Sequence, residues 1–398
     1  MILINKNFSI DIKKSFSAIV KQVDSDVTQS KKQASTIEER DFLSMLNKKT
    51  IRKLVFSKPK RLKNIIIKIY DKYPLVSEYY SPDYFFKDLN LPNELIQNIT
   101  LSLSIKNNKI TVYGNLINAL QEVTEFTMSK PSLILSDIIN TSHTPDSMKD
   151  LRDKFRELLR IKETGVIGNK FNAIFPLWVT LIAEKFNYSL IDKQKAYELV
   201  KFLDINICPY CNSEEIEVII SSNGKDYRPA FDHYIPKFKY PLLSFSLYNL
   251  IPSCTKCNST YKQSLDPMMN TFSNPFSEGV SDIKLFKFNY DLNYIYGDGY
   301  IHSEDISIHL DKQNNNIDAN MQKLSIENRY NSSNCKRVAR QIAKSAADLR
   351  AYENFFNIEP VLFGSFSYEN GVEPLKQQHK KFKQDAIYAF ANKYVPLI

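Results

Sequence analysis

The chain has 398 residues, of which 43% are apolar and 24% are charged, a composition typical of a globular protein and not of a disordered one. Its 53 Lys and Arg residues outnumber its 44 Asp and Glu residues, and the resulting formal net charge of +9 is compatible with a polyanionic partner. Only 9 glycines occur, and neither GxGxxG nor GxxxxGK[ST] is present, which argues against Rossmann-type dinucleotide binding and P-loop hydrolysis.

The N-terminal sequence MILINKNFSIDIKKSF lacks the cationic region and the continuous apolar region of a secretion signal. No stretch of about 18 uncharged apolar residues follows it. We therefore expect a cytoplasmic protein without a membrane anchor.

Helices predominate in the structure expected for residues 1–204. Apolar residues recur at three- and four-residue spacing in segments such as DIKKSFSAIVKQV, as they do on the buried face of a helix. Ser35 and Glu38 form a capping box before another such segment, and Ser81 followed by Pro82 marks a further helix start.

One exception is predicted within this helical part. In residues 101–114, apolar and polar side chains alternate on both sides of the sequence KNNK, which predicts a β-hairpin. Helices resume over residues 115–128 and 145–162, and Gly165 is a candidate C-cap of the second.

Residues 171–186 are apolar around nearly the whole helical circumference, so they predict a buried core helix that Pro176 begins or kinks. A further helix is predicted over residues 193–203. The sequence then changes to short strands, turns and paired cysteines, which indicates a domain boundary near residue 204.

Several short strands are predicted between residues 207 and 311. The segments EIEVIIS and YRPAFD flank Asn223 and Gly224, a strong hairpin turn, and the strand-like segment KLFKFNY and the alternating segment ISIHL follow later. Past residue 317 the pattern returns to helices, most clearly in CKRVARQIAKSAADLRAYENFF and QQHKKFKQDAIYAFANKY.

Four of the five cysteines form two CxxC pairs, Cys208 with Cys211 and Cys254 with Cys257. Each pair can place two thiolates on one side of a tetrahedral ion, so the four together predict a closed structural zinc site. The alternatives are two redox dithiols or four unrelated core cysteines. Cys335 stands alone on a predicted helix and is expected to be a small core residue.

The sequence between and around these pairs resembles that of the HNH endonuclease family. FDHYIPKFKYP carries Asp232 and His233, and NLIPSCTKCNSTYK carries Asn249 and Asn258. These residues match the family's Asp-His strand end, middle Asn and helix-borne last ligand, with the cysteine pairs placed as in its zinc-bracketed members. At the position of the last His in the family's motif, this sequence has Asn258. This variant still supplies a metal ligand.

The resemblance implies a role for each matching residue. His233 is the expected general base, which takes a proton from the attacking water. Asp232 and Asn258 are expected to hold a catalytic Mg²⁺ or Mn²⁺, because they offer oxygen ligands and leave room for water and phosphate. Asn249 is expected to brace the loop and orient the histidine. The alternatives are a buried structural histidine at position 233 and turn or helix-cap roles for Asp232 and Asn258.

Two groups of basic residues are candidate phosphate contacts. Lys237, Lys239 and Lys262 lie near the motif, where Lys262 follows Asn258 by about one helical turn. The second group, which has no acidic residue between its first and last members, consists of Lys48, Lys49, Arg52, Lys53, Lys58, Lys60, Arg61 and Lys63. For both groups, a solvated surface is the alternative.

The expected fold is α+β and mostly helical. It comprises an N-terminal helical domain with an unknown partner at residues 1–204, an HNH ββα-metal nuclease core with a four-cysteine zinc site at 205–290, and a strand-then-helix C-terminal elaboration at 291–398.

The expected activity is metal-dependent hydrolysis of phosphodiester bonds in nucleic acid, with DNA favoured over RNA. The resemblance also extends to effectors of bacterial anti-phage systems of the Septu and retron types, and a regulatory ATPase or another defence protein is a candidate partner of the N-terminal domain. RNA remains an alternative substrate, because the motif engages phosphate and not the 2′-hydroxyl. A non-catalytic zinc module that binds nucleic acid or serves as a scaffold is the alternative from another class.

Overall fold

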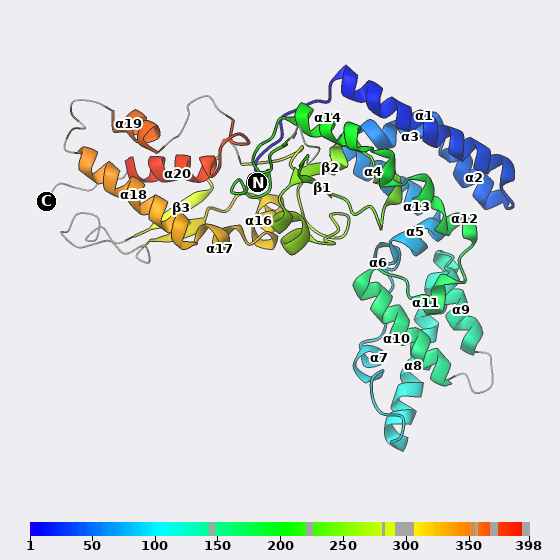
Figure 1. The fold of residues 1–398 in the computed structure, drawn as a ribbon. Helices are drawn as coiled ribbons and strands as arrows, with labels where there is room; N and C mark the ends of the chain where they lie inside the picture. The colour runs from blue at the N-terminus through cyan, green and yellow to red at the C-terminus, as the bar shows by residue number, and fades with distance from the viewer. Residues whose placement is uncertain are drawn as a thin grey trace. The chain divides into compact units, whose positions relative to one another are not determined.

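The computed structural model is α+β and mostly helical, as the sequence predicts (Figure 1). It describes residues 1–142, 148–219, 226–280, 283–290, 306–350, 352, 354, 357–366 and 373–391. The chain forms two compact units, each built from separate stretches of sequence. We call Phe16–Leu190 with Ile235–Leu247 the helical unit, and Met1–Ser15, Ile191–Tyr234 and Tyr248–Ile398 the cysteine unit.

The first helix, α1, runs over Ile10–Gln33 and thus enters the helical unit from residues assigned to the cysteine unit. Helices of different lengths and helical turns make up the rest of the helical unit: α2 (Ile37–Met45), α3 (Lys48–Phe56), α4 (Pro59–Lys72), α5 (Pro74–Tyr80), α6 (Pro82–Phe85), α7 (Asn93–Asn98), α8 (Lys106–Ser129), α9 (Leu133–Ser142), α10 (Met148–Thr164), α11 (Asn169–Asn172), α12 (Leu177–Thr180), α13 (Ile182–Lys185), η1 (Tyr188–Leu190) and η2 (Pro241–Leu243). None of the helices in the described ranges is both long and apolar enough to cross a membrane.

The helix ends agree in part with the predicted caps. The capping box before α2 lies one residue later than predicted: the Thr36 hydroxyl accepts from the Glu39 N–H at 3.1 Å, and the Glu39 carboxylate accepts from the Ser35 N–H at 2.9 Å. Gly165 caps α10 with a φ of +67°, as predicted, and donates its N–H to the Ile161 carbonyl.

The hairpin predicted for residues 101–114 is wrong, because residues 106–114 form the first turns of α8. Within α8 the buried residues recur at four- and three-residue spacing: Val112, Leu116, Ala119 and Val123. Packing of this face in the core overrides the local strand-like alternation, which is a weak determinant when nothing pairs with it.

The single core helix predicted for residues 171–186 is also wrong. The segment forms three short helices, α11 to α13, and Pro176 precedes the second of them as its N-cap. Proline has no N–H to continue a helix, so the chain turns at that point. Phe171, Val179 and Phe186 are buried, whereas Leu177 is 71% exposed.

The loop Ile235–Leu247, which directly follows the predicted catalytic strand, packs inside the helical unit. The Tyr240 ring is buried and stacks on Tyr70 with ring centroids 5.1 Å apart. The Tyr70 hydroxyl donates to the Lys239 carbonyl at 2.5 Å, and the Ser246 hydroxyl donates to the Leu54 carbonyl at 2.5 Å. These contacts fix the course of the chain beyond His233.

The cysteine unit contains α14 (Lys193–Leu203), β1 (Ala230–His233), η3 (Leu247–Asn249), β2 (Leu250–Ser253), η4 (Lys256–Lys262), β3 (Phe286–Asn289), β4 (Ser307–Leu310), α16 (Asn315–Lys323), α17 (Ile326–Tyr330), α18 (Ser333–Arg350), α19 (Ile358–Ser365) and α20 (Lys380–Ala391). Two antiparallel pairs, β1 with β2 and β3 with β4, are the sheets of the described residues. The predicted helix 193–203 and the predicted strand segments around β3 and β4 are confirmed. The predicted turn at Asn223 and Gly224 lies outside the described residues.

The first residues of the chain belong to the cysteine unit and not to the helical one. The Ile2 N–H donates to the Pro209 carbonyl at 2.7 Å, and the Ile4 N–H donates to the Pro275 carbonyl at 2.8 Å. The Met1 carbonyl in turn accepts from the Val280 N–H at 3.0 Å. A division at residue 204 therefore cuts through segments that the structure places in one unit.

Candidate functional site

The structure brings together the four cysteines of the two CxxC pairs. Cys208 and Cys211 lie on a turn after α14, Cys254 follows β2 directly, and Cys257 lies in the first turn of η4. All four side chains are buried, and their sulfur atoms lie within 4.8 Å of one another. Sulfur ligands of a tetrahedral zinc ion are separated by about 3.8 Å when each Zn–S bond is about 2.3 Å. The four cysteines are thus positioned to bind a metal ion, and the donor set suits zinc.

Each of the four sulfurs accepts one hydrogen bond from a nearby donor. The backbone N–H of Cys254 donates to the Cys208 sulfur, and that of Cys257 donates to the Cys254 sulfur, both at 3.4 Å. The Ser213 hydroxyl donates to the Cys211 sulfur at 3.4 Å, and the Arg329 guanidinium donates to the Cys257 sulfur at 3.1 Å. Such donors favour the thiolate form, which is the form that binds metal.

The thiols do not lose their protons equally. Contacts from the neighbouring sulfurs, that of Cys208 first, hold the pKa of Cys211 well below its usual value, and the Arg329 guanidinium adds to the effect. Burial holds the pKa of Cys208 well above its usual value. Because a metal must displace the remaining protons, its binding strengthens as the pH rises.

Residues far along the chain, which the sequence analysis did not single out, support the first cysteine turn. Arg329 and Tyr330 of α17 reach it, and the Tyr330 hydroxyl donates to the Cys211 carbonyl at 2.7 Å. Asn212, in the left-handed conformation with a φ of 53°, accepts from the Lys381 N–H at 3.1 Å. The spacing of the cysteines in the sequence carries no signal for these contacts.

A buried polar network surrounds Asp232, which lies between the two CxxC pairs in the sequence. The Lys262 ammonium donates to one Asp232 oxygen at 2.9 Å, and the Tyr210 hydroxyl donates to the other at 2.6 Å. The side chains of Lys262 and Asp232 are only 1% and 3% exposed. Burial holds the pKa of Tyr210 well above its usual value, so this phenol remains a neutral donor. The charge of the Asp232 carboxylate is therefore already compensated from within the chain.

His233 ends β1 and is half-buried. Its carbonyl accepts from the Lys262 ammonium at 3.0 Å, and its Cα partner across the sheet is Leu250. Asn249 is fully buried at the end of η3, directly before β2, and its carbonyl accepts from the Tyr234 N–H at 2.9 Å. The sheet register thus places Asn249 beside the end of the strand that carries His233.

Asn258 follows Cys257 in η4 and is half-buried. Its backbone N–H donates to the Cys254 carbonyl at 3.0 Å. Its side chain makes no hydrogen bond to any described residue, so the amide is not committed to a partner there. The structure therefore joins Asp232, His233 and Lys262 through direct contacts and holds Asn258 by way of the cysteine turn.

The three lysines predicted to contact phosphate differ in their surroundings. Lys262 is bound to Asp232, and Lys239 is buried in an ion pair with Asp83 of the helical unit. Lys237 is exposed, and its ammonium lies 4.6 Å from the ring centroid of Tyr188. Lys239 and Lys262 thus have buried carboxylate partners within the chain, and contact of the three lysines with phosphate stays a prediction.

Comparisons of the chain with models of protein families, with curated proteins and with solved structures found no match. The resemblance to HNH endonucleases therefore depends on the motif residues of the sequence.

Replacing Lys262 with methionine should destabilise the cysteine unit by about 3–5 kcal/mol, because the Asp232 carboxylate is left buried without its cation. Denaturant unfolding of the purified variant measures the loss. Lys256→Met is the matched control in the same helical segment, η4: its ion pair with Glu214 is largely exposed, and its removal should cost about 0–1 kcal/mol.

The double variant Lys262→Met/Asp232→Asn should recover part of the stability lost in Lys262→Met, since the buried charge is then gone. Equal stability of Lys262→Met and the wild type would contradict the buried ion pair.

Proposed function

We propose that the chain is an HNH-type endonuclease that hydrolyses phosphodiester bonds in nucleic acid, with DNA favoured over RNA. The observation that carries the proposal is the arrangement of strand, strand and helix around the motif residues. β1 ends in Asp232 and His233, β2 pairs with it antiparallel, and η4 follows directly and returns Lys262 to the end of β1. The four-cysteine cluster holds the junction of β2 and η4.

In this proposal His233 is the general base. It ends its strand and is only half-buried, so the imidazole can meet a water molecule at the surface. In its neutral form the imidazole can accept a proton from that water. The hydrogen bond from Lys262 to the His233 carbonyl fixes the backbone of the residue.

A catalytic Mg²⁺ or Mn²⁺ would stabilise the charge that develops on the phosphate and on the departing oxygen. Asn258 fits such an ion because it offers an amide oxygen, but Asp232 does not fit it as placed, because Lys262 already occupies the carboxylate. A dication and an ammonium group repel each other at one carboxylate. The ion and Lys262 therefore compete for Asp232, and the metal dependence of cleavage is the central question of a first assay.

Nicking of supercoiled plasmid tests the proposal. In a buffer freed of divalent ions, we expect no cleavage by the purified protein, and addition of Mg²⁺ or Mn²⁺ should produce open-circular and linear plasmid. Single-stranded DNA and RNA of one sequence, offered in parallel, identify the preferred substrate. Cleavage without added metal would show that Lys262 supplies the only positive charge needed at Asp232.

One observation favours a second candidate function, a zinc-containing module that binds nucleic acid without cutting it. The compensated and buried Asp232 carboxylate is what a purely structural network would contain. Binding of plasmid with no cleavage under any metal condition would support this candidate and contradict the nuclease. A role as an anti-phage effector, with a regulatory ATPase or another defence protein as partner, is part of the nuclease proposal and depends on the sequence resemblance alone.

A further inference from the structure

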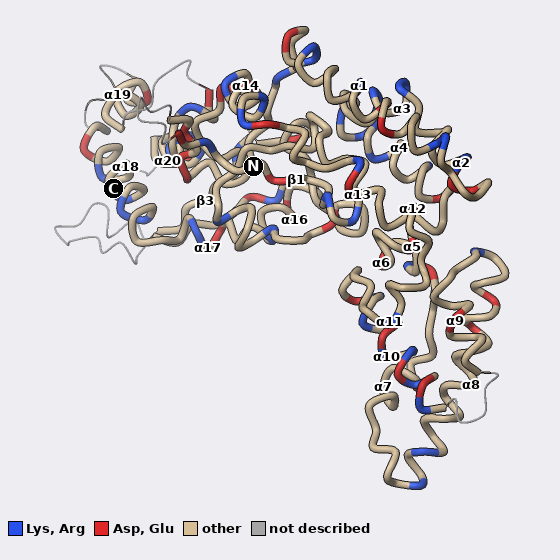
Figure 2. Tube along the Cα trace, turned by 45° about the vertical axis from the view of Figure 1, so that its right-hand side comes forward, with Lys and Arg blue, Asp and Glu red and all other residues tan. Residues whose placement is uncertain are grey.

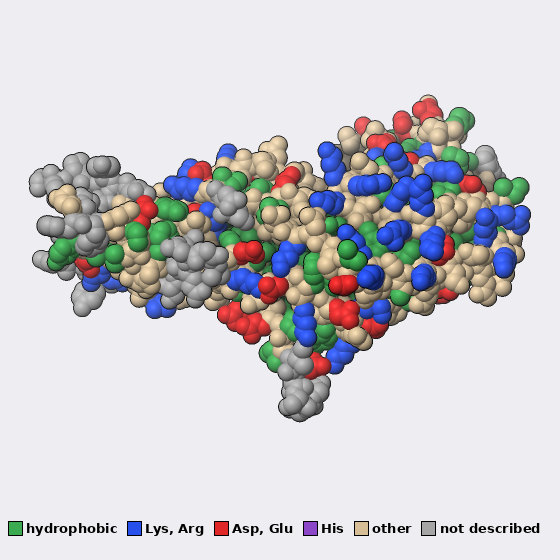
Figure 3. Space-filling view, turned by 90° about the horizontal axis from the view of Figure 1, so that it is seen from above, with side chains coloured by type: hydrophobic (Ala, Val, Ile, Leu, Met, Phe, Trp, Pro, Cys, Tyr) green, Lys and Arg blue, Asp and Glu red, His purple; other side chains and the backbone are tan. Residues whose placement is uncertain are grey.

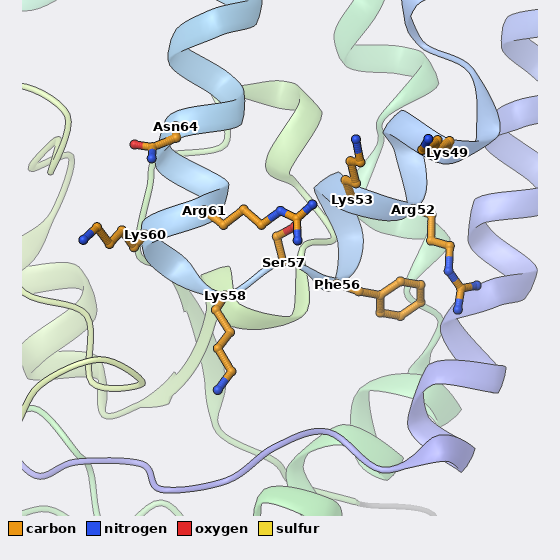
Figure 4. A pocket seen from close by; sticks show the side chains of 9 residues that line it. All are labelled: Lys49, Arg52, Lys53, Phe56, Ser57, Lys58, Lys60, Arg61 and Asn64. Atoms are coloured by element: carbon orange, nitrogen blue, oxygen red, sulfur yellow. The ribbon is translucent and has the colours of Figure 1, made fainter.

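The helical unit carries a strongly basic hollow between α3 and α4, with a volume of about 720 Å³ (Figure 4). Six of its nine lining residues are Lys or Arg, and none is acidic. The lining residues are Lys49, Arg52, Lys53, Phe56, Ser57, Lys58, Lys60, Arg61 and Asn64. We call this surface the α3–α4 hollow.

Helical periodicity explains how the basic side chains gather there. Ile51, Leu54 and Val55 are the buried face of α3, and Leu62 and Ile66 belong to the buried face of α4. The basic residues between these positions point to the opposite faces of the two helices. Lys and Arg positions recur along both helices in Figure 2, and their side chains gather on the right-hand side of the space-filling view in Figure 3.

The positive charge of the hollow is not compensated within the described parts of the chain. None of its six cations forms an ion pair there, and the one side-chain contact among them is that of the Arg52 guanidinium, 5.2 Å from the centroid of the Phe56 ring. Lys72, at the other end of α4, forms an ion pair with Asp41 at 3.0 Å. The lysines of the hollow differ from Lys72 in having no such acidic partner among the described residues.

The backbone adds to this charge. Neither α3 nor α4 has an acidic residue in its first turn, and the N-terminus of α4 at Lys58 has no side-chain cap. The free N–H groups of that 14-residue helix carry a partial positive charge that faces the same region. An anionic ligand would relieve the mutual repulsion of all these groups.

We propose that the α3–α4 hollow binds the phosphate backbone of nucleic acid independently of base sequence. Six cations spread over two helices exceed what one phosphate group can satisfy, whereas a nucleic acid strand presents a row of phosphates. The inference deepens the proposed nuclease function by assigning a surface that holds its substrate. It concerns binding alone, so it is tested without cleavage.

The test replaces four exposed residues of the hollow together: Arg52→Gln, Lys58→Gln, Lys60→Gln and Arg61→Gln. Fluorescence anisotropy with a labelled 20-base-pair duplex, at several salt concentrations and without divalent ions, measures affinity. Each lost phosphate contact lowers the slope of log affinity against log salt by about 0.9, so the slope should fall by about 2–4 and the affinity at low salt at least tenfold.

The matched control removes the same charge elsewhere, in Lys21→Gln/Lys31→Gln/Lys32→Gln/Lys106→Gln, four exposed lysines that do not line the hollow. This control should lower the slope by less than about one. An equal loss in both quadruple variants, or no loss in the first, would overturn the proposal. The proposal would also be overturned if the quadruple variant of the hollow lost binding to phosphatidylserine vesicles but kept its binding to the duplex. If the protein binds duplex through the hollow but never nicks plasmid, the result supports this proposal and contradicts the proposed nuclease function.

Discussion

Replacing Cys254 with serine should abolish tight zinc binding and unfold or strongly destabilise the cysteine unit. The Cys254 sulfur is one of four that lie within 4.8 Å of one another, and the residue also joins the end of β2 to η4. The free energy of zinc binding in small four-ligand sites is about 10–16 kcal/mol and is largely free energy of folding. Elemental analysis should find about one zinc per wild-type chain and none in the variant, whose thermal unfolding should begin at much lower temperature.

Cys335→Ser is the matched control, because Cys335 is buried in α18 outside the cluster. That variant should keep its zinc and lose only the small stability of a buried thiol. A wild-type protein without zinc, or a Cys254→Ser variant as stable as the wild type, would contradict the metal centre.

Replacing His233 with alanine should reduce cleavage by about 10²–10⁴-fold, the usual contribution of a general base. Zinc content and unfolding should be unchanged, since His233 is half-buried at a strand end and contributes no sulfur to the cluster. Single-turnover cleavage of a labelled duplex, measured beside zinc content, separates a lost base from a lost fold. His309→Ala, an exposed histidine of β4, should cleave like the wild type.

A His233→Ala variant that cuts at the wild-type rate would remove His233 from the catalytic role. Asn258→Ala is the cleaner probe of metal binding, because its side chain has no hydrogen-bond partner to lose among the described residues and the variant should need more Mg²⁺ for the same rate. Asp232→Ala is a poor probe of the same question, since it leaves the Lys262 ammonium buried without a counter-charge.

The local features of the site could be predicted from the sequence, but the contacts between residues that are distant in the sequence could not. The CxxC spacing suffices to predict the cysteine cluster, because few arrangements of paired thiols satisfy one tetrahedral ion. The pairing of Lys262 with Asp232 depends on the tertiary approach of η4 to β1, which no periodicity encodes. The sequence position of Lys262, one turn after Asn258, therefore predicts a contact with phosphate and gives no sign of the ion pair with Asp232.

The same distinction applies to the fold. Helix α14 has the ends that the sequence predicts, since its amphipathic pattern is a local signal. Residues 106–114 were mistaken for a strand because their alternation is short and only packing of the rest of α8 decides its structure. The hydrogen bond from the Ile2 N–H to the Pro209 carbonyl joins residues that are far apart in the sequence, and a single sequence carries no signal for such a pair.

The interleaving of the two units has a consequence for how the protein folds during synthesis. Residues 1–15 belong to a unit whose next part begins at residue 191, and residues 16–190 await the segment 235–247. At about 5–20 residues per second, the N-terminal segment waits on the order of 10–40 s for its partner around Pro209. Contacts of such long sequence separation slow folding, and meanwhile the apolar side chains of Met1, Ile2 and Ile4 remain accessible to other chains and to chaperones. No single cut in the chain releases either unit whole: a fragment that begins at residue 205 lacks residues 1–15, and one that ends at 204 lacks residues 235–247.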